Sequence, residues 1–509
     1  MKKTITTIVA VAMLLANCIA LPTALAENGG VDGDTNNWGK LDPNATVEVK
    51  KELPQEYVDA RTKVPLDNTL TVTGGDIRGF HYENGDIQVY QGIPYAEPPI
   101  GDLRWTAARE PSPWEGVKDC MEWGASAVQM PQKPYKFWTT EYIITNKTYS
   151  EDCLTLNVWT NGSEETKPVL VYIHGGANTS GGSSCAVYEG EELAKKGVVV
   201  VTINYRLGAY GFLATEELKE EDPVNVGNYA LTDMIQALTW VQANIASFGG
   251  DPGNVTIMGQ SAGASDVCSI MASPKADGLY HKAVICSGVS TNKKNTTLDE
   301  KIAIASEKFA KMAKKDGKDY SLAGLRTLTN DDYMNIVSAG RGVNVGTELL
   351  PDGLFNRTCA GEEPSIPVMT GMVLGDGTMF GAKGDTPEEI EYNLSIAPAV
   401  FSKNRTKGVT YAYVFTRDVP GPDEKTSGPQ HTYEVPYFLN ILHPVRKDYW
   451  QEADRDLAET MSNYLVNFMK NGDPNGEGLT EWTPCGKDAA FLEIDTTCVM
   501  KNTPAEMVP

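Results

Sequence analysis

The sequence predicts an α/β fold, with a mostly parallel central sheet and helices on both faces, in a single large domain with insertions. Short runs that are apolar throughout recur along the chain, and strands buried on both faces of a parallel sheet have this composition. Segments with the three- and four-residue apolar spacing of amphipathic helices alternate with these runs. The 509 residues, 41% of them hydrophobic, are enough to bury a large core.

The expected strands are short and cover residues 69–73, 87–90, 154–159, 169–173, 198–203, 255–258, 283–286, 367–373 and 411–415. The expected helices cover residues 229–248, 299–314 and 453–469. In the first of these helices, Leu231, Ile235 and Leu238 share one apolar face. Strands and helices therefore alternate along the chain, as they do in α/β proteins.

The N-terminus predicts export. Residues 1–26 contain two lysines, then an apolar stretch, then small residues at positions 24–26, which is the order of a secretory signal peptide. We therefore expect a secreted or extracytoplasmic protein whose mature chain begins near Glu27. A lipid anchor at Cys18 is the alternative. Residues 27–68 lack clear periodicity, and we expect them to form a mobile lead-in.

Composition excludes several partners and cofactors. The formal net charge of −23 repels nucleic acids and anionic membrane surfaces. No run after residue 26 approaches the roughly 20 apolar residues of a membrane span. Of the nine cysteines, Cys18 lies in the signal segment, and the other eight could form disulfides in an oxidising compartment. No cysteines and histidines have zinc-site spacing, so no structural metal is expected.

The most informative motif is Gly259-Gln260-Ser261-Ala262-Gly263, between a strand-like run and a helix-like segment. A serine at so sharp a turn projects its hydroxyl above the sheet, and glycines two residues away on each side avoid clashes. The start of the following helix favours the negative charge that develops when an ester carbonyl is attacked. We therefore predict that Ser261 is a nucleophile. An incidental serine in a glycine-rich turn is the alternative for the motif alone.

A serine nucleophile needs a histidine base, which an acid in turn orients. With a nucleophile at such an elbow, the order along the chain is serine, acid, histidine, which leaves His431 and His443 among the five histidines. His443 lies in an apolar stretch before a proline, so we expect a structural role for it. His431 follows a flexible loop after a strand and is the predicted base.

The acid and the oxyanion donors are expected at the ends of strands. Asp376 lies in a turn directly after the expected strand at residues 367–373, and it is the predicted acid. A plain Asp-Gly turn is the alternative. The glycine-rich loop after residues 169–173 and the residue after the nucleophile are expected to supply the oxyanion hole. The predicted donors are the backbone N–H groups of Gly176, Ala177 and Ala262.

Longer motifs in the same order along the chain resemble those of the carboxylesterase type B and cholinesterase family of α/β-hydrolases. The resemblance covers roughly residues 70–500. The matching segments are Gln91-Gly92-Ile93-Pro94-Tyr95-Ala96, Leu103-Arg104-Trp105, Ser150-Glu151-Asp152-Cys153-Leu154-Thr155-Leu156-Asn157-Val158-Trp159, Asn204-Tyr205-Arg206-Leu207-Gly208, Phe248-Gly249-Gly250-Asp251-Pro252 and Gly259 to Gly263.

The resemblance implies an α/β-hydrolase catalytic domain at residues 69–509, with Ser261 as nucleophile, His431 as base and an acid at position 376. The family more often has glutamate there, so Asp376 is a departure from its pattern. Many members also have three glycines and an aromatic residue in the oxyanion loop, where this chain has Gly175-Gly176-Ala177-Asn178.

The resemblance also suggests structural features. It implies a disulfide that ends at Cys153, for which Cys120 is a candidate partner because the usual first cysteine is absent. A second candidate bridge joins Cys485 and Cys498. Arg104 and Glu151 resemble a structural ion pair of the family.

These observations predict a serine hydrolase that cleaves small-molecule carboxylic esters through an acyl-enzyme, with no metal or organic cofactor. A non-catalytic binding or adhesion protein of the same fold is the rival from another class. A lipase and a deacetylase of plant polysaccharides are narrower rivals. The natural ester and the oligomeric state stay open, because sequence patterns do not position the insertions at residues 130–149 and 381–400 that would form the pocket walls.

Overall fold

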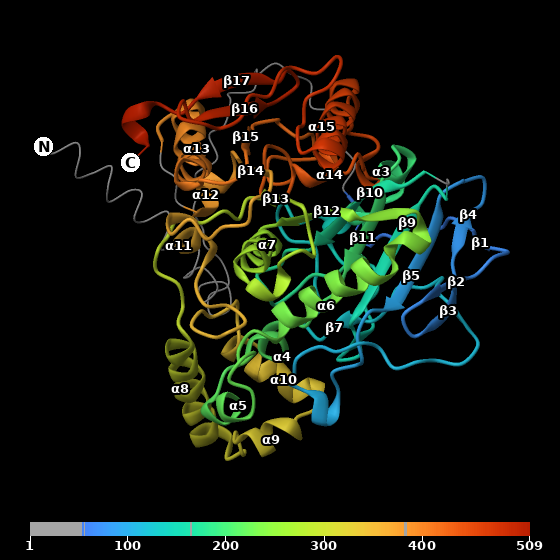
Figure 1. Ribbon diagram of the computed structural model, residues 1–509, viewed down its shortest axis with the longest axis vertical. Coiled ribbons are helices and arrows are strands. Elements are labelled where there is room, and N and C mark those ends of the chain that lie inside the picture. The colour runs from blue at the N-terminus through green and yellow to red at the C-terminus, as the bar shows by residue number, and fades with distance from the viewer. Residues whose placement is uncertain (1–52, 55, 163–164, 381–383, 509) are drawn as a thin grey trace, which may run out of the picture.

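The protein is built around a large, twisted mixed sheet, which runs from the top of Figure 1 through the centre to the right. The computed structural model describes residues 53–54, 56–162, 165–380 and 384–508. The predicted signal segment, residues 1–26, lies outside them. In spatial order, the strands of the main sheet are β1 (Lys63–Pro65), β4 (Phe80–Tyr82), β5 (Gln88–Pro94), β9 (Thr155–Thr160), β11 (Val199–Ile203), β10 (Lys167–Ile173), β12 (Gly250–Gln260), β13 (Lys282–Cys286), β14 (Val368–Val373), β15 (Thr410–Phe415), β16 (Ala490–Ile494) and β17 (Val499–Asn502).

The centre of this sheet is parallel. Every neighbouring pair from β11 to β16 runs in the same direction. The strands at both edges pair antiparallel instead. The prediction of a mostly parallel sheet with helices on both faces is confirmed for the centre, where the carboxyl ends of the strands meet at one edge and ligands bind in folds of this class.

The helices that the structure describes are α3 (Glu191–Lys195), α4 (Gly208–Phe212), α5 (Glu216–Glu221), α6 (Tyr229–Asn244), α7 (Ala262–Ala272), α8 (Leu298–Asp316), α9 (Leu322–Arg326), α10 (Asn330–Ile336), α11 (Leu354–Cys359), α12 (Asp376–Phe380), α13 (Pro387–Asn404), α14 (Val435–Phe438) and α15 (Glu452–Asn471). The expected helix at 229–248 thus ends four residues early as an α-helix and continues as a 3₁₀ turn, which Gly249 terminates in the left-handed conformation.

Strand β10 shows how the core forms on both faces of the sheet. All seven of its residues are buried. Val169, Val171 and Ile173 belong to the hydrophobic cluster that includes α6 and α7. Leu170 and Tyr172 belong to a second cluster, which includes α15. Because successive side chains of a strand point to opposite faces, a strand covered on both faces is apolar along its length, as the run at residues 169–173 indicates; the buried Lys167 lies at the start of β10.

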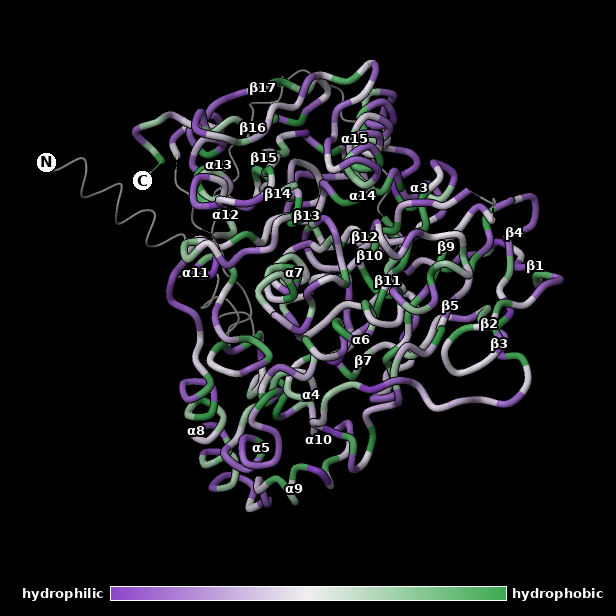
Figure 2. The backbone as a smooth tube through the Cα atoms, in the orientation of Figure 1, coloured by the Kyte–Doolittle hydropathy of each residue, from purple (hydrophilic) through white to green (hydrophobic). Residues whose placement is uncertain are grey.

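A helical lobe lies below the sheet in Figure 1 and consists of α4, α5, α8, α9 and α10. Helix α8 is typical: it starts with a capping box at Thr297 and Glu300 and ends at Gly317 in the left-handed conformation. Its buried face includes Leu298, Ile302 and Phe309. In Figure 2 the helix carries both hydrophobic and hydrophilic segments, as expected for an amphipathic surface helix.

The N-terminal part differs from the sequence prediction in two ways. Strand β1 lies inside the predicted lead-in at residues 27–68, and its antiparallel pairing with β4 attaches the end of that stretch to the main sheet. The expected strand at 69–73 is β2 (Leu70–Val72), but it joins a separate sheet with β3 (Gly75–Arg78) and β6 (Val117–Asp119). A further two-stranded sheet pairs β7 (Ser126–Ala127) with β8 (Tyr149–Ser150).

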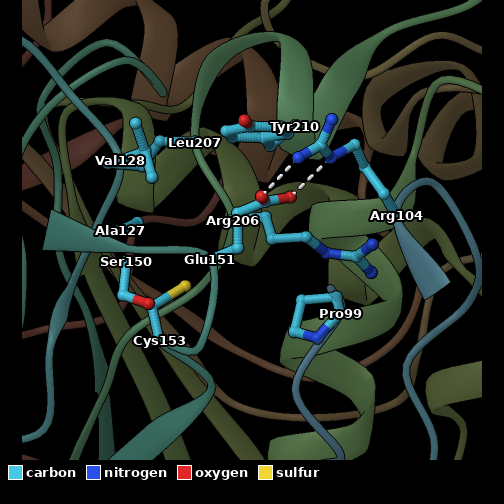
Figure 3. A pocket seen from close by; sticks show the side chains of 10 residues that line it. All are labelled: Pro99, Arg104, Ala127, Val128, Ser150, Glu151, Cys153, Arg206, Leu207 and Tyr210. Carbon is cyan, nitrogen blue, oxygen red and sulfur yellow. Dashed lines mark hydrogen bonds and ion pairs between the residues drawn. The ribbon is translucent and has the colours of Figure 1, made fainter. Parts of the chain in front are cut away.

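Arg104 and Glu151 form the predicted ion pair within this N-terminal part, and Arg104 also links it to the lobe. Two guanidinium nitrogens of Arg104 donate to the two carboxylate oxygens of Glu151 at 2.6 and 2.7 Å. Figure 3 shows both bonds, with the ring of Tyr210 beside the guanidinium. Arg104 also donates to the carbonyl oxygens of Leu325, Arg326 and Leu328. The pair therefore anchors the end of α9.

The two predicted disulfides do not form, since all eight cysteines that the structure describes are free thiols. Cys485 lies in the same hydrophobic cluster as Phe491, whereas Cys498 lies in that of Leu492. Phe491 and Leu492 are neighbours on β16 and point to opposite faces, so the two thiols are kept apart.

Cys120 and Cys153 are free thiols as well, although both are buried in one hydrophobic cluster. Cys153 lies near the charges of Asp233 and Arg206, whereas Cys120 lies near those of Lys118 and Asp119. The spacing of cysteines along the sequence gives no information on such differences.

Candidate active site

Ser261 lies at a sharp elbow between β12 and α7. Its φ of 57° and ψ of −123° are unusual for a residue with a side chain, and its backbone N–H donates to the carbonyl oxygen of Cys286 at 2.9 Å. A Cβ on Gly259 would overlap the carbonyl oxygen of Gly263, and a Cβ on Gly263 would overlap that of Ile173. Both glycines thus have the steric reason that the sequence analysis gave for them.

The glycine-rich loop after β10 faces this elbow. Gly176, Ala177 and Asn178 all have positive φ, of 117°, 55° and 56°. Among the backbone hydrogen bonds outside regular elements in the described part of the chain, none uses the N–H of Gly176 or Ala177. Ala262 is the first residue of α7, so its N–H has no partner within the helix. These three N–H groups are therefore available to an incoming oxygen.

The side chains of His431 and Asp376 contact each other. The His431 Nδ1 and an Asp376 carboxylate oxygen are 2.5 Å apart, and both residues are buried. The other carboxylate oxygen accepts the backbone N–H of Val373, at the end of β14, at 2.9 Å. Burial alone would lower the pKa of His431, but the charge of Asp376 and its hydrogen bond outweigh burial and raise this pKa above its ordinary value. With Nδ1 as donor, Nε2 of the neutral ring is an acceptor.

Gln260 is a site residue that the sequence analysis did not single out. Its Nε2 lies 3.2 Å from the Nε2 of His431, so the residue next to the nucleophile contacts the nitrogen that would take the serine proton. The two residues are 171 positions apart in sequence. The only signal in the sequence is the presence of Gln260 inside the elbow motif.

Glu434 is a second unpredicted residue, one turn after His431. It is fully buried, and Ser287 Oγ donates to it at 3.2 Å. Burial, and secondarily the charge of Asp376, raise the pKa of Glu434 to about 8. Its carboxyl group is therefore mostly protonated at neutral pH.

Asn178 is bonded to Asp266 rather than left open on the cavity wall. Its amide nitrogen donates to the Asp266 carboxylate at 2.7 Å, and both side chains are buried. Burial raises the pKa of Asp266 to about 7. The hydrogen bond joins the oxyanion loop to α7, which carries Asp266.

The other buried histidines have structural roles. Nδ1 of His174 lies 2.8 Å from the carbonyl oxygen of Gly175, and burial lowers its pKa to about 4. Nδ1 of His443 accepts the backbone N–H of Val445, and burial lowers the pKa of this histidine to about 4 as well. The structural role predicted for His443 agrees with this geometry.

One cavity of about 750 Å³ brings the predicted site residues together. Its walls include Ser261, His431, Gly176, Ala177 and Ala262. Both insertions that the sequence could not position contribute to it. Their contributions are Gln132, Lys133, Tyr135, Trp138, Tyr142 and Ile143 from the first, and Asn393, Ile396 and Ala397 from the second.

Comparisons with known proteins agree with this arrangement. The carboxylesterase family matches the chain over residues 66–396 and 385–508. The chain belongs to the carboxylesterase family. It is a carboxylic ester hydrolase with the α/β-hydrolase fold. Among the described helices of this esterase, none has the length and apolar character needed to cross a bilayer.

The relatives of the esterase are hydrolases from animals and bacteria. The para-nitrobenzyl esterase of Bacillus subtilis (strain 168) is 34% identical, over 86% of this chain and 96% of its own. The medium-chain fatty acyl-CoA hydrolase precursor of Anas platyrhynchos is 31% identical, over 83% and 88%. A solved PNB esterase structure aligns with a TM-score of 0.74 at 25% identity, over 87% of this chain and all of its own. These similarities do not favour the non-catalytic alternative.

Proposed function

We propose that the esterase is a secreted serine carboxylesterase that hydrolyses small carboxylic esters through an acyl-enzyme, with Ser261, His431 and Asp376 as its triad. The observation that carries the proposal is the 2.5 Å contact between His431 and Asp376. The same histidine lines one cavity with Ser261, which lies at a strained elbow of the backbone. That combination of nucleophile, base and orienting acid defines the triad on many folds.

In this mechanism, Asp376 accepts the Nδ1 proton of His431 and keeps Nε2 available as a base. Nε2 takes the Ser261 hydroxyl proton while Oγ attacks the ester carbonyl carbon. The N–H groups of Gly176, Ala177 and Ala262 stabilise the resulting oxyanion. His431 then protonates the leaving alcohol and activates the water that hydrolyses the acyl-enzyme. No metal or organic cofactor takes part.

Gln260 sets one requirement for this sequence of steps. Its amide nitrogen contacts the same His431 nitrogen that must accept the serine proton. The Ser261 hydroxyl therefore has to displace this contact, or share the nitrogen with it, when substrate binds. The geometry of catalytic hydrogen bonds commonly tightens only in the substrate complex.

The N-terminal sequence supports the proposed export. Residues 1–26, which lie outside the described residues, have the composition of a signal peptide. Detection of the protein in the medium, with Glu27 near its N-terminus by mass spectrometry, tests this part of the proposal. Retention of residues 1–26 on the mature chain would contradict it.

The catalytic proposal is tested by Ser261→Ala, with Ser265→Ala on the same helix as the matched control. Ser261→Ala should abolish turnover of p-nitrophenyl acetate and leave thermal unfolding nearly unchanged. Ser265 lies one turn further on in the same cavity, and its hydroxyl donates to the backbone oxygen of Ser261; it has no part in the proposed proton transfers, so its alanine variant should retain turnover. Turnover by Ser261→Ala at the wild-type rate would refute the nucleophile.

A further inference from the structure

The cavity of the esterase is basic although the protein as a whole is acidic. Lys133, Lys294 and Arg341 line it, and Asp266 is the only acidic side chain among its described lining residues. None of the three basic side chains forms a salt bridge within the described part of the chain. The formal net charge of the full chain is −23, so positive charge is concentrated where the substrate binds.

Asp266 does not neutralise these cations. Its carboxylate accepts a hydrogen bond from Asn178 at 2.7 Å. Because burial raises its pKa to about 7, a large fraction of its carboxyl groups is protonated at neutral pH. The cavity therefore keeps a net positive charge when it is empty.

Arg341 is the least exposed of the three cations. Its side chain is half-buried, and its Nε is shielded from solvent with no hydrogen-bond partner in the described residues. Burial lowers its pKa, and no carboxylate opposes this effect. A charged group that is partly removed from water without a partner costs free energy. An anion that pairs with Arg341 would offset this unfavourable desolvation free energy.

The backbone around Arg341 is held beside the oxyanion loop. The buried amino group of Lys301 donates to the carbonyl oxygens of Gly342 and Gly227. A Cβ on Gly342 would lie 4.0 Å from Oδ1 of Asn178. Asn178 directly follows Ala177, a proposed oxyanion donor. Arg341 therefore projects into the cavity from a segment anchored close to the reacting carbonyl.

We propose that Arg341 determines specificity, and that the substrates of this esterase carry a carboxylate in addition to the scissile ester. The inference rests on the proposed function. A guanidinium matches a carboxylate with two parallel hydrogen bonds, a geometry that an ammonium group does not offer. The exposed Lys133 and Lys294 add positive charge that attracts the same anion. The carboxylate could lie on the acid part or on the alcohol part of the ester, and both arrangements have the same chemistry.

The experiment compares esters that differ only in this charge. Monoethyl adipate and its carboxamide analogue, ethyl adipamate, test the acid part. 4-Acetoxybenzoate and 4-acetoxybenzamide test the alcohol part. For each pair, the ratio of kcat/KM for the carboxylate over kcat/KM for the carboxamide is measured in the wild type, Arg341→Met, Arg341→Lys and Lys308→Met. Lys308 bonds Ser338 and does not line the cavity, and its positive charge is close enough to Arg341 for the two to repel each other. Lys308→Met therefore removes a charge near Arg341 but no group that reaches the substrate.

The ratio should exceed 1 for at least one pair in the wild type. Loss of a hydrogen bond between charged groups corresponds to about a tenfold to hundredfold fall in this ratio for Arg341→Met. Arg341→Lys should restore part of it, and Lys308→Met should leave it unchanged. If Arg341→Met does not fold, the wild type provides the readout: added sodium chloride should lower kcat/KM for the carboxylate ester more than for the carboxamide.

Two failures can be told apart. Turnover of neutral esters with equal ratios in the wild type and Arg341→Met, for both pairs, would overturn the role of Arg341 and leave the proposed function intact. Absence of turnover of every ester, p-nitrophenyl acetate included, would overturn the proposed function and the inference with it.

Discussion

Replacement of Asp376 by asparagine should nearly abolish esterase activity without unfolding the protein. In the wild type, one carboxylate oxygen accepts from Nδ1 of His431 and the other accepts from the backbone N–H of Val373. An asparagine has only one acceptor oxygen. If that oxygen faces Val373, its NH₂ group faces His431 and favours the tautomer with the proton on Nε2, which cannot take the proton of Ser261.

The opposite orientation of the asparagine is also unfavourable. Its NH₂ group would then face the N–H of Val373, and the buried N–H would lose its acceptor at a cost of about 1 to 3 kcal/mol. The inactive orientation is therefore preferred. A wrong tautomer lowers kcat by about four orders of magnitude in a triad of this kind, which corresponds to about 5 kcal/mol of transition-state stabilisation.

The assay is kcat and kcat/KM for p-nitrophenyl acetate as a function of pH, with the thermal midpoint as a control for folding. In the wild type, kcat/KM should rise with pH through a midpoint above about 6.5, because His431 acts only when neutral and Asp376 raises its pKa. In Asp376→Asn, the midpoint of any residual activity should fall, because the charge and hydrogen bond of Asp376 are the main effects that oppose burial on this pKa. Activity within tenfold of the wild type, with the same midpoint, would refute this reasoning.

Three further variants test other parts of the structure. Glu434→Gln should keep most activity at pH 7, since the pKa of Glu434 is raised to about 8 and its carboxyl group is already mostly protonated. Because the folded state binds this proton more tightly than the unfolded state, the stability of the wild type should fall relative to that of the variant as pH rises from about 4.3 towards 8. The same dependence of the melting temperature on pH in both proteins would contradict this prediction. Gly176→Ala should lower kcat by about 10² to 10³, because the new Cβ would overlap the carbonyl oxygen of Ser180 and shift an oxyanion donor. Gly197→Ala, also at positive φ but in open space, is its control and should keep its kcat. Glu151→Gln should lower the free energy of unfolding by about 3 kcal/mol, measured in urea, because it leaves the guanidinium of Arg104 buried without its carboxylate; an unchanged urea midpoint would show that this pair is not stabilising.

Sequence patterns were sufficient for the parts of the fold that depend on local chemistry. The apolar runs identified the buried strands, such as residues 169–173 of β10, because burial on both faces favours apolar side chains at successive positions. The elbow at Ser261 could be read from Gly259 and Gly263, since the clashes that require glycine arise within a few residues or against the neighbouring strand. The known chain order of serine, acid and histidine for a nucleophile at such an elbow singled out Asp376 and His431 as candidates.

Features that depend on contacts between distant segments could not be predicted. The contact of Gln260 with His431 and the raised pKa of Glu434 arise from neighbours that meet only when the fold forms. The same limit applies to the basic cavity, whose charges come from separate loops. Both expected disulfides were wrong. Cys485 and Cys498 lie in different hydrophobic clusters on opposite faces of β16, and sequence spacing contains no information on such placement.

The central claim is that Ser261 is the nucleophile and forms the acyl-enzyme. The most direct measurement is labelling of the intact protein with a fluorophosphonate probe, followed by mass spectrometry of its peptides. The account predicts one adduct per chain, located on Ser261, with loss of turnover in proportion to labelling. Full turnover after Ser261 has been labelled, or inactivation by an adduct on another residue, would contradict it.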